Sequence, residues 1–162
     1  MHPALIAQLL VLVALANAMP LLAKKALGRP SAWPIDGGAT FLDGRPLLGA
    51  SKTVRGLVVS LLATPLVSSL MGLGWTLGIV VGACAMAGDL LSSFTKRRMG
   101  LPPSSKAIGL DQIPESLLPF IAAGWFLPLT LLDIVAGMAI FFVGELAVSR
   151  LLFKLNVRDE PY

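Results

Sequence analysis

Residues 3 to 23 carry no charged side chain, and this uninterrupted apolar run restricts how the chain can fold more than any other feature. An α-helix needs about 20 mostly apolar residues to cross the roughly 30 Å of hydrocarbon in a bilayer. Only 14% of the 162 residues are charged and the mean hydropathy is +0.81, which indicates an integral membrane protein. The run lacks the basic leading region of a cleavable signal peptide, so we expect it to be retained.

Two further apolar regions are each long enough for two crossings. Residues 57 to 88 have no charge, and Gly72 and Gly74 offer a tight turn between two helices. From Leu117 to about Phe153 the chain is again largely apolar, and Asp133 divides this region. We therefore predict an all-α fold, a polytopic membrane protein with one domain over residues 1–162. Its five transmembrane helices are predicted at about 3–23, 55–72, 75–95, 115–132 and 134–153.

The 13 basic residues are distributed unevenly along the chain. Six lie between the first and second spans, four between the third and fourth, and three near the C-terminus. The positive-inside rule then predicts an external N-terminus, with the C-terminus and two long loops, about 24–54 and 96–114, in the cytoplasm. The net charge of +4 therefore reports orientation, and we expect no nucleic-acid partner. A single cysteine, Cys84, excludes a disulfide framework.

The first long loop includes "WPIDGGATFLDGRPLLGASKTVRGL", residues 33 to 57, which mixes aromatic, apolar and glycine residues with isolated charges of both signs. Such a composition favours a folded loop that approaches a ligand closely over a solvated tail. Glycines 37, 38, 44 and 49 would let backbone amides face an anion, with Arg45, Lys52 and Arg55 adding positive charge. Alternatively, these are juxtamembrane turns whose cations contact anionic lipid headgroups.

The second long loop begins in "GDLLSSFTKRRMGLPPSSKAIGLDQIPE", residues 88 to 115. Its first half is predicted to continue the third span as a helix, which places Asp89, Ser93, Lys96 and Arg97 on one face at the membrane boundary. Asp89 and Asp111 are candidate Mg²⁺ ligands, since Mg²⁺ takes hard oxygen donors completed by substrate phosphates. A structural ion pair between Asp89 and the neighbouring cations is the alternative.

The segments "DGG", "DGRPLLGASKTVRGL" and "GDLLSSFTKRRMG…LDQIPE" closely resemble the CDP-archaeol synthase family of CTP-dependent membrane cytidylyltransferases. The resemblance covers both loops and the five-helix arrangement. A more distant likeness is to phosphatidate cytidylyltransferases. Their "GDL…S…KR" pattern, followed some way on by an aspartate, matches Gly88, Asp89, Leu90, Ser93, Lys96, Arg97 and Asp111. Their His-Gly-Gly motif has no counterpart here, which favours the first family.

This resemblance implies that a lipid phosphate attacks the α-phosphorus of CTP, pyrophosphate leaves and a CDP-lipid forms. It implies Mg²⁺ on Asp89 and Asp111, and contact of Lys96 and Arg97 with the triphosphate, with Asp89, Lys96 and Asp111 as the catalytic set. The remaining residues expected around the nucleotide or lipid phosphate are Asp36, Gly37, Gly38, Asp43, Arg45, Lys52, Arg55, Ser93 and Lys106. The residues leave open whether the lipid chains are isoprenoid ethers or acyl esters.

Two other functions are compatible with parts of the pattern. A small transporter would place Asp133 and Glu145 on a permeation route, but the polar residues gather at one membrane face and no half of the chain is repeated. A scaffold bound to anionic lipid would need only the cations. Gly74, Gly78 and Gly82 would permit close helix approach, either within the chain or in a homodimer.

Overall fold

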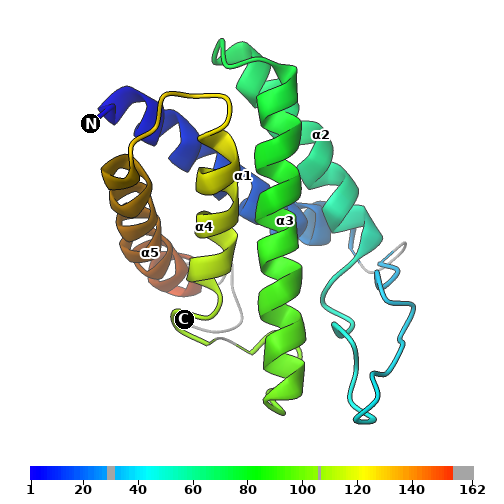
Figure 1. Cartoon of the computed structure of the whole chain (residues 1–162). Coiled ribbons are helices and arrows are strands. Elements are labelled where there is room, and N and C mark those ends of the chain that lie inside the picture. Colours follow the sequence, from blue (N-terminus) through cyan, green and yellow to red (C-terminus); the bar gives the residue numbers. More distant parts are fainter. Residues whose placement is uncertain (29–31, 106, 155–162) are drawn as a thin grey trace.

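Five α-helices follow one another in this computed structural model, which describes residues 1–28, 32–105 and 107–154 (Figure 1). Within those ranges the β pairing amounts to two isolated bridges, Pro34 with Thr53 and Thr40 with Pro46. The predicted all-α fold is therefore confirmed. The helices are α1 (Pro3–Leu27), α2 (Val54–Leu70), α3 (Trp75–Arg98), α4 (Gln112–Ala123) and α5 (Leu131–Lys154).

Three of the helices are long and apolar enough to cross a membrane, namely α1, α3 and residues Leu131–Leu151 of α5. The apolar α2 has 17 residues, whereas α4 has 12 and is shorter than the predicted span of 115–132. Twelve residues extend about 18 Å, well under the hydrocarbon thickness. At its end the α4 helix tightens into a turn, in which the amide of Phe126 donates to the carbonyl of Ala123 (3.0 Å).

Close packing of α2 on α3 depends on two glycines of α3. A Cβ atom at Gly78 would lie 2.4 Å from Cα of Pro65, and one at Gly82 would lie 3.2 Å from Cβ of Thr64. Any side chain at Gly78 would therefore separate the helices. The packing of these glycines within the chain, predicted from their spacing, is confirmed.

The same face of α2 carries buried hydroxyl groups, and each donates to a backbone carbonyl. Ser60 Oγ donates to Ala16 O of α1 (2.7 Å), Thr64 Oγ1 to Ser60 O (2.8 Å), and Ser68 Oγ to Gly74 O at the start of α3 (2.8 Å). Polar groups need such partners in a bilayer because no water is present to satisfy them.

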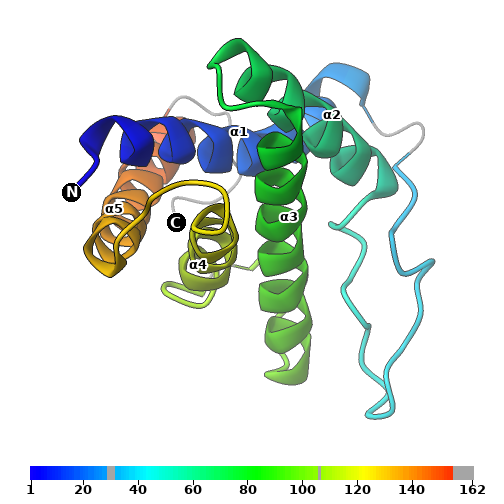
Figure 2. The ribbon, with the colours of Figure 1, turned by 45° about the horizontal axis from the view of Figure 1, so that its top comes forward.

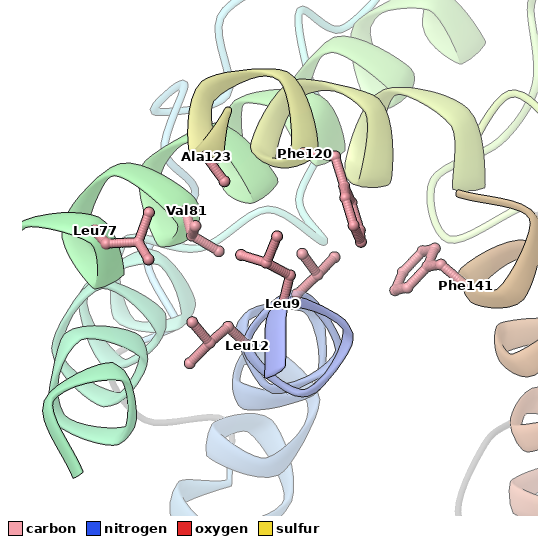
Figure 3. Packing of buried hydrophobic residues seen from close by; sticks show 8 residues of the cluster. Leu9, Leu12, Leu77, Val81, Phe120, Ala123 and Phe141 are labelled. Carbon is pink, nitrogen blue, oxygen red and sulfur yellow. The ribbon is translucent and has the colours of Figure 1, made fainter. Parts of the chain in front are cut away.

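The apolar core lies where α1 crosses the other helices (Figure 3). Leu9 and Leu12 of α1 point toward side chains from α3, α4 and α5, and both are fully buried. Phe120 of α4 fits beside Gly137 of α5, where a Cβ atom would lie 2.3 Å from the ring. This core holds α4 against α3. It thereby brings the polar residues of the C-terminal half of α3 close to those at the start of α4.

Candidate functional site

The segment that joins α1 to α2 runs beside the C-terminal half of α3 (Figure 2), and this half of α3 carries buried polar side chains. On this part of α3 Ser92, Ser93, Lys96 and Arg97 are buried, although three of them were expected at a membrane boundary. A buried charge is costly unless it is paired, so the partners of these residues define the site.

The first ion pair joins the α1–α2 segment to α3. Nζ of Lys52 donates to Oδ1 of Asp89 (2.5 Å), and the two side chains are only 21% and 20% exposed. Lys52 precedes Thr53, whose side chain caps α2 by accepting from the amide of Gly56 (3.2 Å). Since Gly56 packs against Pro20 of α1, the position of Lys52 is set by the junction of α1 and α2.

The second ion pair joins α3 to the start of α4. Nζ of Lys96 lies 2.6 Å from Oδ1 of Asp111 and also donates to the carbonyl of Ser105 (2.9 Å). Asp111 in turn accepts from the amide of Ala107 (3.1 Å). The two predicted metal ligands, Asp89 and Asp111, thus each face a different lysine, and the lysine of Asp89 was predicted as a phosphate ligand.

Glu115 of α4 belongs to this site, although the sequence did not single it out. It is 6% exposed, shares a side-chain hydrogen bond with Asp89, and lies within electrostatic range of Lys52 and Glu145. Two carboxyl groups in contact require a proton or a cation between them. The usable signal was the spacing of Gln112, Glu115, Ser116 and Pro119, which form the buried stripe of α4.

Gly88 is the reason that Glu115 reaches Asp89. A Cβ atom at Gly88 would lie 2.3 Å from the carbonyl oxygen of Pro114 and 2.7 Å from the amide nitrogen of Glu115. The backbones of α3 and α4 therefore touch at the residue next to Asp89. No larger residue fits there without moving α4.

Arg97 is buried but only partly satisfied. Its side chain is 3% exposed, and Nη2 donates to the carbonyl of Pro102 (2.7 Å). Its Nε and Nη1 atoms have no hydrogen-bond partner within the described ranges of the chain. Arg97 and Arg45, together with Pro102 and Pro103, line an open pocket of about 330 Å³. Unsatisfied N–H groups of a buried arginine are the donors that a phosphate would fill.

Asp36 organises the α1–α2 segment from inside. Its carboxylate accepts from the amides of Leu48 (2.9 Å), Gly49 (3.0 Å) and Gly38 (3.0 Å). Partial desolvation raises the pKa of Asp36, but these bonds outweigh it, so that its pKa lies below the ordinary value. Gly37 and Gly38 have φ of +58° and +82° in the turn that follows, a conformation that favours glycine.

The other predicted residues lie apart from the Lys52–Asp89 pair. Asp43 and Arg45 contact the end of α3, and Arg55 donates to the carbonyl of Gly28 (3.0 Å). Ser93 is buried on α3, one turn from both Asp89 and Lys96. Lys106 lies outside the described residues. Within those residues there is no group of three or more His, Cys, Asp or Glu side chains arranged to hold a metal ion.

The fold and site define a class, a helical membrane enzyme whose buried cations and carboxylates meet at one end of the bundle. The chain matches the family model for CDP-archaeol synthase over residues 5–76 and 73–162. It therefore belongs to the CDP-archaeol synthase family, as the sequence motifs predicted. Enzymes of this family are CTP-dependent lipid cytidylyltransferases.

Individual relatives agree with this assignment. The CDP-archaeol synthase of Hyperthermus butylicus is 37% identical over 134 residues, 75% of this chain and 79% of that protein. That of Sulfurisphaera tokodaii is 31% identical over 137 residues, 80% of this chain and 81% of that protein. A solved structure of an intramembrane enzyme for archaeal membrane lipid biosynthesis is similar with a TM-score of 0.74 and 29% identity, over 87% of this chain and 90% of that one.

Proposed function

We propose that this enzyme transfers the CMP moiety of CTP to a glycerol phosphate lipid with isoprenoid ether chains, of the 2,3-di-O-geranylgeranylglyceryl phosphate type. A lipid phosphate oxygen forms a bond to the α-phosphorus, the bond to the β-phosphate breaks, and pyrophosphate leaves. The observation that carries the proposal is buried Arg97, whose Nε and Nη1 atoms lack partners within the described residues and which lines an open pocket. Such an arginine fits a phosphate group.

The reaction needs no protein nucleophile, because a lipid phosphate is already nucleophilic. The difficulty is to bring several anions together in line, and catalysis then consists of positioning and charge neutralisation. Lys96 and Arg97 supply positive charge on one side of α3, and Lys52 supplies it from the α1–α2 segment. Asp89 and Arg97 are eight residues apart, about 12 Å along the helix axis. We assign the triphosphate to this stretch.

We assign Mg²⁺ to the carboxylates of the site, where it would take the place of the lysines that face Asp89 and Asp111. Asp89 and Asp111 would hold it, with Glu115 beside Asp89, because Mg²⁺ is usually bound by one or two carboxylates together with substrate phosphates and water. The contact between the carboxyl groups of Asp89 and Glu115 supports this assignment, since a cation there would relieve their repulsion. When bound, Mg²⁺ would neutralise phosphate charge during the transfer.

Orientation is part of the proposal. By the positive-inside rule, the cations of both long loops support a site on the cytoplasmic side, where CTP is available, with the N-terminus outside. Reporters inserted after residue 40 or within residues 100 to 108 should both report cytoplasm, and one at Leu73 should report the exterior. An external readout at either long loop would contradict this orientation.

The test is incubation of purified protein in nanodiscs with labelled CTP, Mg²⁺ and the isoprenoid ether phosphate. We expect a CDP-lipid and pyrophosphate in equal amounts. Phosphatidic acid in a parallel reaction tests the alternative acyl-lipid substrate, and the matching lipid alcohol is the control. Equal use of the alcohol would overturn the chemistry, and competition by ATP as effective as by CTP would overturn the choice of nucleotide.

A further inference from the structure

A second cluster of contacts lies at the C-terminal end of α3, beyond the Lys52–Asp89 pair. It consists of Phe41, Asp43 and Arg45 from the α1–α2 segment and of Phe94 and Arg98 from α3, and we call it the loop latch. Arg98 was not among the residues predicted for the site. Figure 2 shows the α1–α2 segment running beside this half of α3.

Arg98 is the centre of the loop latch. Its Nη1 donates to Oδ1 of Asp43, and its Nη2 donates to the carbonyls of Pro46 and Arg45. Its guanidinium carbon lies 4.8 Å from the ring centroid of Phe41 and 5.0 Å from that of Phe94. Arginine suits this position because its planar group can hydrogen-bond at its edge while contacting aromatic rings.

The other members of the loop latch contact one another or the backbone of Arg98. The rings of Phe41 and Phe94 meet edge to face with centroids 5.3 Å apart. Arg45 donates in the opposite direction, from its Nη1 to the carbonyl of Arg98. The α1–α2 segment and α3 thus each supply an arginine that donates to the backbone of the other. The side chains of Arg98 and Asp43 are 20% and 39% exposed, so the pair is partly shielded from water.

The α1–α2 segment runs along α3, from the loop latch at the C-terminal end of the helix toward Asp89. Asp43 contacts Arg98, Gly49 lies against Pro103 and Arg97, and Lys52 pairs with Asp89. Between these points the carboxylate of Asp36 holds the amides of Leu48 and Gly49. The loop latch is thus a second point, besides the junction of α1 and α2, at which the segment that carries Lys52 is held against α3.

We propose that Arg98 is a positioning residue for cytidylyl transfer, acting through Asp43 and the two phenylalanine rings to hold Lys52 in place. Only the activity measurements that test this inference rest on the proposed function. We do not assign Arg98 to the triphosphate, because both of its terminal nitrogens are engaged by the segment and its charge is matched by Asp43, which leaves only its Nε without a partner within the described residues. This role separates Arg98 from Arg97, although the two are adjacent in sequence.

The decisive comparison is between Arg98→Ala and Asp43→Asn, assayed for CDP-lipid formation over a range of CTP concentrations. Both should lower kcat/KM for CTP, by on the order of tenfold or more, because a small displacement of a binding group has a large effect on rate. Arg98→Lys should recover only part of the loss, because a lysine lacks the planar fork. If Arg98 bound phosphate directly, Asp43→Asn would release it and leave kcat/KM unchanged or higher, which would overturn the proposal.

Lys25→Ala is the matched control, because it removes one exposed positive charge at the end of α1 without touching the loop latch. It should retain wild-type kcat/KM. Combining Arg98→Ala with Lys52→Ala gives a further check, since two residues that act through one segment should show losses that are less than additive. Fully additive losses would overturn the proposal.

A measurement without substrate separates the loop latch from the proposed function. Leu42 is 96% exposed at the tip of the segment, so a spin label at Leu42→Cys in a Cys84→Ala background should not disturb packing. Arg98→Ala and Asp43→Asn should each increase its mobility, whereas Lys25→Ala should not. Mobile labels together with normal kcat/KM would overturn the positioning role, whereas an inactive wild type with the same mobility changes would overturn only the proposed function. An unchanged label would show that no latch exists.

Discussion

Two aspartates, the fully buried Asp133 and the partly buried Asp89, have opposite surroundings. Asp133 is fully buried at the start of α5 and accepts from the amide of His2 (2.8 Å), the ring of His2 (2.9 Å), and the amide and hydroxyl of Thr130 (2.9 and 2.8 Å). Asp89 faces the long side chain of Lys52 and the carboxyl group of Glu115. The first arrangement satisfies a carboxylate completely, whereas the second leaves it able to exchange its partner for a ligand.

The comparison predicts that substitution of Asp89 lowers activity, whereas substitution of Asp133 lowers stability. Asp89→Asn is expected to give the largest effect on activity. Loss of the charge that attracts Mg²⁺ should lower CDP-lipid formation by about a thousandfold or more, while the protein inserts and purifies normally. Lys96→Ala should instead raise KM for CTP. Turnover and thermal stability are measured on the same preparation, and an unstable Asp89→Asn protein with normal turnover would make Asp89 a structural residue like Asp133.

Gly88→Ala tests the contact that brings Glu115 to Asp89. The new methyl group would collide with the Pro114 carbonyl, so α4 must move, at a cost of about 1–3 kcal/mol typical of overpacking. We expect both a lower melting temperature and a lower kcat. Gly144→Ala in α5 is the control, because nothing lies within 4 Å of the added atom. A Gly88→Ala protein with normal kcat would contradict the role of this contact.

Asp133→Asn should affect stability and leave turnover almost unchanged. An asparagine keeps one acceptor oxygen but loses the charge and at least one of the four bonds from His2 and Thr130, since Oδ1 accepts one of them and Oδ2 three; the bonds from His2 hold the N-terminus of α1 to α5. The melting temperature should fall by several degrees while kcat below that temperature stays near wild type. A large loss of kcat in the folded protein would support the transporter-like or catalytic role that we do not assign to Asp133.

The smallest effect is expected for the mobility of the α1–α2 segment when it is measured as a function of pH. Because the pKa of Asp36 is lowered in the folded protein, its ionised carboxylate stabilises the folded segment fully above the ordinary pKa of 3.8. This stabilisation is lost as the pH falls through the lower pKa that Asp36 has in the folded protein. A spin label at Leu42→Cys should therefore stay immobile down to about pH 4 and loosen below it. Asp36→Asn should remove that step, and an unchanged step would assign it to Asp43.

The membrane fold could be predicted from the sequence because a bilayer imposes its thickness on every crossing helix. The long apolar runs before Lys24 and after Gly56 therefore located α1, α2 and α3 closely. The end of α4 at Ala123 could not be predicted, since Gly124 and the following turn lie within an equally apolar run. Hydropathy reports what lipid tolerates and carries little information on where a helix packed inside the protein ends.

The site was predictable in its residue types and less so in its pairings. The motif around Asp89 and Lys96 indicated anion chemistry at one face, yet the partner of Asp89 is Lys52, from a segment 37 residues away. Arg97 and Arg98 are neighbours with the same chemistry, and only the path of the α1–α2 segment distinguishes them. Such pairings depend on tertiary geometry, which spacing along one helix does not encode.

The buried hydroxyl groups on one face of α2 have a consequence for how the helices insert and pack in the membrane. Ser60 and Ser68 donate to carbonyls at Ala16 and Gly74, so these groups are satisfied only when α2 has α1 on one side and the start of α3 on the other. An α2 helix alone in the bilayer would expose that polar face to lipid, which disfavours insertion. We therefore expect the first three helices to be stabilised by packing together, and a nascent chain released before Gly74 would lack the carbonyl that accepts from Ser68.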